Sequence, residues 1–164
     1  MVKVVVVTGS VCSGKTTVAK VLAERLGFEY VDVNEVIDKN PDVVSGYDEG
    51  LKTKIVDSDK LVEVLKRIIR DSENDLVIDS HLGHYLPKDY VDVCVVVKCS
   101  DLDVLRKRLE ARGYGMKKIR ENLDAEILDV CLIDALEAGH SVLSVDSSGG
   151  VDYDDLVMRV REVL

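Results

Sequence analysis

The sequence predicts an α/β fold with a parallel sheet, and three observations predict it. Short runs rich in β-branched residues alternate along the chain with segments whose apolar residues recur at helical spacing. The first run, residues 3–7, is four valines after one lysine, as expected of a strand buried on both faces. A glycine-rich stretch, residues 9–16, follows that strand directly. We therefore expect a doubly wound sheet with helices on both faces.

Length and composition limit the class of protein. The chain has 164 residues, 46% apolar and 32% charged, which suits one globular domain. Its longest apolar run, residues 4–7, is too short to span a membrane, and the N-terminus does not resemble a signal peptide. The four cysteines form no C-x-x-C pair, so we expect reduced thiols and a cytoplasmic protein.

The formal net charge of −9 argues against binding nucleic acid through a basic surface. Such a charge could attract a basic protein partner, and solubility alone accounts for it equally well.

Five strands and six helices are expected. The strands are residues 3–7, 28–31, 75–79, 91–97 and 141–145. The helices are residues 14–26, 33–39, 59–70, 100–112 and 116–138, and a last one capped by Asp152. Gly27 and Gly139 are expected to end two of them, and Ser100 with Asp103 has the spacing of a capping box.

Two segments lack a simple periodic pattern of apolar residues. Residues 41–58 show no clear period and are expected to form a loop. Residues 116–138 carry apolar residues on more than one helical face, which predicts one long helix buried on two sides.

The stretch GSVCSGKT, residues 9–16, has the P-loop spacing G-x-x-x-x-G-K-T between a strand and a helix. Gly9 permits a sharp exit from the strand, and the loop amides up to Gly14 can surround a phosphate at the helix N-terminus. Lys15 is expected to reach the β- and γ-phosphates, Thr16 to coordinate Mg²⁺ and Thr17 to touch the α-phosphate. The alternative is a glycine-rich turn that contains Lys-Thr by chance.

A second carboxylate is expected beside the P-loop, and the strand DLVID supplies it at Asp79. The residues that follow the carboxyl ends of parallel strands gather at one edge, which would also hold Ser100 and Asp146. Asp79 is therefore predicted to face the magnesium ion, unless it is only a surface acid. His81 follows two residues later and could position a water or bind a phosphate, with a structural histidine as the alternative.

Two arginines precede a glycine-rich junction. Arg108 and Arg112 lie four residues apart, hence on one helical face, and Gly-Tyr-Gly follows at 113–115. A hinged arginine can place positive charge over a phosphoryl group in transfer. A solvated charged helix is the alternative. The predicted ATP-binding residues are Gly9, Ser10, Val11, Cys12, Ser13, Gly14, Lys15, Thr16, Thr17, Arg108 and Arg112.

Together these segments resemble a known family. The set GSVCSGKTT (9–17), GYDE (46–49), VIDSH (77–81), RLEARGY (108–114) and ENLDAEI (121–127) is similar to the adenylate kinase isoenzyme 6 family over nearly the whole chain. The resemblance implies a single P-loop NTPase domain, 1–164, of the nucleoside monophosphate kinase-like fold, with strand order 2-3-1-4-5. It implies Mg²⁺-dependent transfer of the ATP γ-phosphoryl group to AMP, a slower ATPase activity, and binding of a basic small-subunit ribosomal protein during maturation of the small-subunit RNA.

The resemblance also implies roles for particular residues. The monophosphate-binding region is about 32–55 and a short lid is about 111–121. The catalytic residues are Lys15, Asp79, His81 and Arg112. Thr16 and Asp79 serve the magnesium ion, partly through water. The AMP side holds Asn34, Lys39, Tyr47 and Asp48.

One departure from the family affects the acceptor. Relatives place an arginine for the AMP phosphate where this chain has Asp38, and the neighbouring Lys39 lacks the bidentate fork of arginine. The lid holds no cysteine pair, so no zinc is expected there.

Three functions therefore stay open. The first is an adenylate kinase. The second is an ATP-driven switch or chaperone for a ribosomal protein with weak kinase activity, which the missing arginine favours slightly. The third is another small-molecule P-loop kinase, such as one acting on cytidylate or shikimate.

Overall fold

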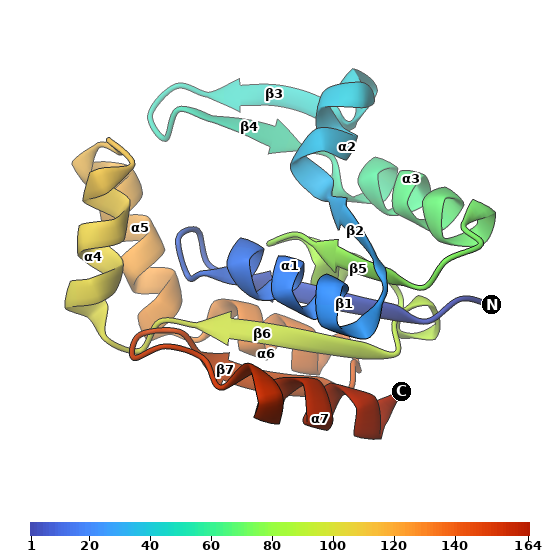
Figure 1. The fold of residues 1–164 in the computed structure, drawn as a ribbon. Helices are drawn as coiled ribbons and strands as arrows, with labels where there is room; N and C mark the ends of the chain where they lie inside the picture. Colours follow the sequence, from blue (N-terminus) through green and yellow to red (C-terminus); the bar gives the residue numbers. More distant parts are fainter.

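A five-stranded parallel sheet forms the centre of the computed structural model, which describes residues 1–164 (Figure 1). Its strands are β1 (Val4–Gly9), β2 (Glu29–Asp32), β5 (Leu76–Asp79), β6 (Val93–Lys98) and β7 (Val142–Asp146). They lie in the order β2-β5-β1-β6-β7. Counted within the sheet alone, this is the predicted order 2-3-1-4-5, so the predicted fold class is confirmed.

Helices cover both faces of the sheet because β1 alternates its valines between the two faces. Val5 and Val7 pack with helices α1 (Lys15–Leu26) and α7 (Tyr153–Val163). Val4 and Val6 pack with α2 (Val33–Lys39), α3 (Ser58–Asp71) and α6 (Val130–Glu137). All four valines are fully buried, which explains the unbroken apolar run.

The remaining helices are α4 (Leu102–Ala111), α5 (Met116–Ile127) and three short 3₁₀ turns, Pro41–Val43, Gly83–Tyr85 and Lys88–Tyr90. Aspartate side chains cap four of the helices, the first being α2, where Asp32 accepts from the Asn34 amide. Asp57 accepts hydrogen bonds from the first-turn amides of α3, Asp101 from those of α4, and Asp152 from that of Asp155 in α7. The capping residue of α4 is therefore Asp101, and the prediction of Ser100 was wrong by one residue. The Ser100 hydroxyl instead donates to Asp146.

The segment predicted as a loop contains a hairpin. Strands β3 (Val44–Asp48) and β4 (Thr53–Val56) pair antiparallel in a sheet of their own. In Figure 1 this hairpin stands apart from the central sheet, beyond α2. The turn that joins the strands is closed by Asp48, whose carboxylate accepts from the Leu51 amide at 3.0 Å. The loop prediction for 41–58 was wrong.

The predicted long helix is two helices. Between α5 and α6, Asp129 adopts a left-handed conformation with φ 51°, which an α-helix does not permit, and its carboxylate pairs with Lys98 at 2.6 Å. Nor is the segment buried on two sides, because Ile127, Leu128 and Ile133 are among the exposed residues of this stretch. None of the helices is long and apolar enough to cross a membrane.

Candidate active site

A cavity of about 880 Å³ lies at the carboxyl edge of the sheet. The P-loop forms its floor, the start of α2 and the hairpin line one side, and α4 with α5 lines the other. The loop after β7 completes the wall. The hairpin turn approaches α5 directly, since a Cβ atom at Gly50 would lie 2.8 Å from the Lys117 ammonium nitrogen. The end of β5, at Asp79, also lines the cavity, so a substrate there would touch several separate segments of the chain.

The P-loop backbone requires its two glycines. Gly9 has φ 155°, and a Cβ atom there would meet the Val97 carbonyl and lie 2.6 Å from Ser13 Oγ. Gly14 caps α1 with φ 98°, a conformation that L-residues with side chains rarely adopt. The fold therefore enforces a tight loop at the N-terminus of α1, where amide groups and the helix dipole favour an anion.

Arg108 braces this loop from α4. Its guanidinium donates to the carbonyls of Cys12 and Ser13 at 3.3 and 3.4 Å, and to the Ser147 hydroxyl at 3.0 Å. The Ser147 hydroxyl also donates to the Ser13 carbonyl. The Ser13 amide donates to the Ser10 carbonyl inside the loop, whereas the Gly14 and Lys15 amides donate to no protein group and are left for a ligand.

Asp146 holds the loop that carries Ser147. Its carboxylate accepts from the backbone amides and hydroxyls of both Ser100 and Ser148. Partial burial alone would raise the pKa of Asp146, but these hydrogen bonds outweigh it and hold the pKa at about 2. This carboxylate therefore stays charged at any physiological pH.

Glu126 is a functional candidate that sequence reasoning missed. It is the only buried residue of α5, and its carboxylate accepts from the Ser10 hydroxyl at 2.9 Å and from the Cys99 amide at 3.1 Å. It therefore ties α5 to the P-loop and to the end of β6. A glutamate among other acids in a helical pattern gives no sequence signal for this contact.

Asp79 lies at the end of β5 with only 5% of its surface exposed. Its Oδ2 accepts from the Thr16 hydroxyl at 2.8 Å and from the Tyr30 phenol at 2.6 Å, while no protein group donates to Oδ1. Burial raises the pKa of Tyr30, and the bond to Asp79 adds to the shift, so the phenol keeps its proton. Tyr30 carried no signal in the sequence, since its role depends on β2 pairing beside β5.

These oxygens suit a magnesium ion. Mg²⁺ prefers oxygen ligands and in kinases is held by one or two carboxylates together with substrate phosphates. Thr16 and the free oxygen of Asp79 provide such ligands beside the P-loop. The chain contains no cluster of three or more His, Cys, Asp or Glu side chains suited to a metal, and this mode of binding needs none.

Lys15 and His81 both face the cavity. Burial lowers the pKa of Lys15, and the Asp79 carboxylate opposes that shift. Loss of hydration, together with the positive charge of Lys15, lowers the pKa of His81 to about 4. His81 lies at the rim, with an exposed face toward solvent, and is neutral at physiological pH. A neutral imidazole can accept a hydrogen bond from a water molecule.

Two more cations reach the cavity from the end of α4 and from α5. Arg112 caps the end of α4, is exposed, and is followed by Gly113 with φ 75°. Lys118 of α5 lies with its ammonium 4.1 Å from the centre of the Tyr114 ring. Arg112 was predicted from its hinge, whereas Lys118 and Tyr114 were not singled out.

The acceptor side is less basic. Asn34 and Thr53 line the cavity, whereas Lys39, Tyr47 and Asp48 do not. Asp38, at the position of the missing arginine, pairs with Lys54 at 2.9 Å. The predicted AMP-binding role of Lys39, Tyr47 and Asp48 stays a prediction.

Comparison with known proteins agrees with this arrangement. A family model described as an AAA domain matches residues 5–129. The putative adenylate kinases of Thermococcus onnurineus and Methanocaldococcus jannaschii are 38% and 34% identical, over 89% and 98% of this chain and 76% and 85% of their own lengths. The adenylate kinase isoenzyme 6 homolog FAP7 of Saccharomyces cerevisiae is 36% identical over 95% of this chain and 79% of its own. The chain belongs to the adenylate kinase isoenzyme 6 family.

Solved structures extend this family's fold to other kinases. A shikimate kinase from Acinetobacter baumannii matches 99% of this chain and 93% of its own with a TM-score of 0.66 and 15% identity. A gluconokinase from Sinorhizobium meliloti matches 98% and 90% with a TM-score of 0.54 and 18% identity. At these identities the likeness concerns the fold alone.

Most of the predicted ATP-side residues of this adenylate kinase isoenzyme 6 relative meet at one cavity. Those that line it are Val11, Cys12, Gly14, Lys15, Thr16, Thr17, Asp79, His81, Arg108 and Arg112. Gly9, Ser10 and Ser13 lie behind them in the buried part of the loop. Their functional assignments are predictions that the geometry permits.

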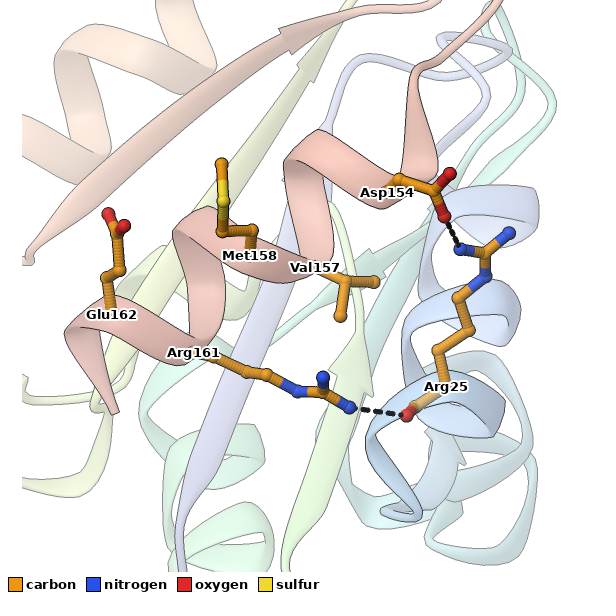
Figure 2. A pocket seen from close by; sticks show the side chains of 6 residues that line it. All are labelled: Arg25, Asp154, Val157, Met158, Arg161 and Glu162. Atoms are coloured by element: carbon orange, nitrogen blue, oxygen red, sulfur yellow. Dashed lines mark hydrogen bonds and ion pairs between the residues drawn. The ribbon is translucent and has the colours of Figure 1, made fainter.

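A second hollow, of about 560 Å³, lies between the end of α1 and α7 (Figure 2). Its two arginines are already bonded, because Arg25 pairs with Asp154 at 2.5 Å and Arg161 donates to the Arg25 carbonyl at 3.2 Å. No P-loop residue lines it. We therefore assign the chemistry to the larger cavity.

Proposed function

We propose that the protein is a Mg²⁺-dependent adenylate kinase that converts ATP and AMP into two ADP, with a slower ATPase activity, and that it assists maturation of the small ribosomal subunit in the cytoplasm. The observation that carries the kinase is the convergence of Lys15, Thr16 and Asp79 with the lid residues Arg112 and Lys118 around one cavity. Family membership supports the same activity, because relatives at 34–38% identity are named as putative adenylate kinases.

Each residue has a physical task in this proposal. The P-loop amides and the dipole of α1 bind the phosphates of ATP, and Lys15 neutralises charge on the β- and γ-phosphates. Asp79, oriented by Thr16 and Tyr30, presents its free oxygen toward the metal. Thr16 and Asp79 would hold Mg²⁺, which would offset negative charge on the phosphates.

The lid supplies the remaining positive charge. Arg112 and Lys118 are two cations on the wall of the cavity opposite α2. From there they would offset negative charge on the γ-phosphoryl group as it moves to its acceptor. The phosphate of AMP is already a competent nucleophile, so no general base is needed. Rate enhancement then comes from positioning, charge neutralisation and exclusion of water by the lid.

A second candidate is an ATP-driven switch with weak kinase activity. The pairing of Asp38 with Lys54 favours it, because the acceptor side lacks a free cation at the position of the family arginine. Neutral His81 would then position the attacking water. The proposed partner, a basic small-subunit ribosomal protein, suits a chain of net charge −9.

Turnover in a coupled assay with Mg-ATP, alone and with AMP, CMP, UMP, GMP or shikimate, tests the proposal. Selective stimulation by AMP is expected of the adenylate kinase. Slow hydrolysis that no acceptor stimulates would reject the kinase and leave the switch. Stimulation by another acceptor would identify a different small-molecule kinase.

A further inference from the structure

The outward side of α6 and the turn before it are apolar. Five of the twelve large apolar side chains exposed in this protein lie within residues 127–136. They are Ile127, Leu128, Val130, Ile133 and Leu136. We call these five residues the α6 apolar face. Contiguous exposed apolar surface on a soluble protein commonly marks an interaction site.

Helical geometry explains why the sheet cannot cover this face. Cys131, Leu132 and Ala135 pack against the core beneath α6. Ile133 and Leu136 lie three residues apart on the opposite side, with 45% and 55% of their surfaces exposed. The segment thus has the two apolar sides that its sequence suggested, and the chain covers only one of them.

The α6 apolar face lies within an acidic stretch of the chain. Residues 121–139 contain six carboxylates and no lysine or arginine. Glu126 is buried against the P-loop, Asp129 pairs with Lys98, and Asp134 lies 3.6 Å from His84. The other three, Glu121, Asp124 and Glu137, are exposed and form no ion pair. Two lysines lie nearby: Lys98, which is paired with Asp129, and Lys88, beside Gly139 after the end of α6.

We propose that the α6 apolar face docks a positively charged segment of a partner protein that presents apolar side chains. This inference rests on the proposed function, since it assigns a surface to the basic partner named there. Apolar contact supplies binding energy, and the exposed carboxylates select a basic partner and speed the encounter.

Charge excludes the other occupants. Two copies of the chain meeting through this face would bring their carboxylates together, which costs energy. Nucleic acid and anionic membrane surfaces are repelled by the same charges. None of the five residues lines the nucleotide cavity, so nucleotide turnover is expected to be independent of them.

The test uses full-length protein and a panel of small-subunit ribosomal proteins from the same source, each purified and titrated by calorimetry. The double variant Ile133→Glu, Leu136→Glu is expected to weaken the best binder by about tenfold or more. The matched control is Met158→Glu on α7, which adds a charge at a residue 53% exposed on the opposite side of the sheet. Its affinity is expected to stay within about twofold of wild type.

Charge reversal tests the second half of the inference. Asp124→Lys with Glu137→Lys is expected to weaken the same complex severalfold and to flatten its salt dependence. Glu162→Lys on α7 is the control. Circular dichroism and AMP-dependent turnover of every variant should match wild type, because all the substituted residues are exposed and outside the cavity.

The outcomes separate the claims. Binding that the α6 variants leave unchanged would overturn the docking surface and leave the proposed partner in place. If no ribosomal protein binds the wild type, both the proposed partner and this docking surface are wrong. The proposed kinase activity is tested separately, by the coupled assay. A wild-type dimer in sedimentation that Ile133→Glu, Leu136→Glu dissociates would overturn the choice of occupant.

Discussion

The phenol of Tyr30 donates a 2.6 Å hydrogen bond to the Asp79 oxygen that also accepts from Thr16. Both donors therefore occupy Oδ2 and direct the free oxygen of this buried carboxylate toward the P-loop cavity. Such second contacts orient a metal-binding carboxylate and commonly matter about as much as the ligand itself.

Tyr30→Phe removes this donor while keeping the ring. We expect the Mg²⁺ concentration for half-maximal activity to rise about tenfold, because the carboxylate loses an orienting bond. Affinity for ATP without metal, measured with a fluorescent analogue, should not change. Tyr90→Phe is the control. Tyr90 precedes β6, at the edge of the sheet opposite the cavity, and its side chain forms no hydrogen bond. An unchanged Mg²⁺ requirement would show that Tyr30 only fills space.

Lys15→Ala and Arg112→Ala each remove a positive charge that we propose lies beside the phosphoryl group during its transfer. Each is expected to lower AMP-dependent kcat by about two orders of magnitude or more, as losses of such charge do. Arg106→Ala, on α4 but outside the cavity, should retain activity. Near-normal turnover by the Arg112 variant would mean that Lys118 alone serves the lid.

His81→Ala should lower ATP hydrolysis by about two orders of magnitude while ATP affinity stays within about twofold, if the neutral imidazole positions water. His81→Gln, which can also hold a water, should keep part of the rate. Equal losses in hydrolysis and affinity would contradict the water-positioning role.

Glu126→Ala should lower the free energy of unfolding by about 1–3 kcal/mol, since the buried Cys99 amide and the Ser10 hydroxyl lose their acceptor. Urea denaturation measures this change. Glu121→Ala, exposed on the same helix, should stay within about 0.5 kcal/mol of wild type. Equal stability of the two variants would contradict a structural role for the Glu126 contacts.

The buried His84 should make stability depend on pH. Burial lowers its pKa, and His140 lowers it further, whereas Asp134 raises it without reversing the shift. In the unfolded chain the imidazole gains a proton near its ordinary pKa of about 6.5, while the folded protein resists protonation there. Stability contributed by the neutral form is therefore present at higher pH and is lost as pH falls below about 6.5.

We therefore expect the free energy of unfolding to fall as the pH is lowered from 7.5 to 5. His84→Asn should flatten that part of the curve even if it lowers stability at pH 7.5. A curve with the same slope in both proteins would remove His84 as its cause.

Strands β1, β5 and β6 could be predicted because each is a short run rich in β-branched residues, and the P-loop because its spacing fixes a mechanism. The hairpin could not, since β3 and β4 stand apart from the sheet and neither buries a full face. Alternation of apolar and polar residues is then absent, although it is the signal by which a half-buried strand is recognised.

The break between α5 and α6 was invisible for a different reason. Asp129 adopts a left-handed conformation that sequence reasoning assigns first to glycine, and the ion pair with Lys98 depends on β6 lying beneath it. Likewise, Tyr30 and Glu126 act through residues 49 and 116 positions away in the sequence. Such contacts follow from the packed fold and leave no local pattern.

The central claim is that this chain transfers a phosphoryl group between ATP and AMP. Phosphorus NMR of a reaction containing Mg²⁺, ATP and AMP at equal concentrations tests it most directly. We predict that ATP and AMP disappear together and that two ADP form for each AMP consumed, with little inorganic phosphate. If AMP stays constant while ADP and inorganic phosphate accumulate in equal amounts, the protein is an ATPase and the kinase assignment is wrong.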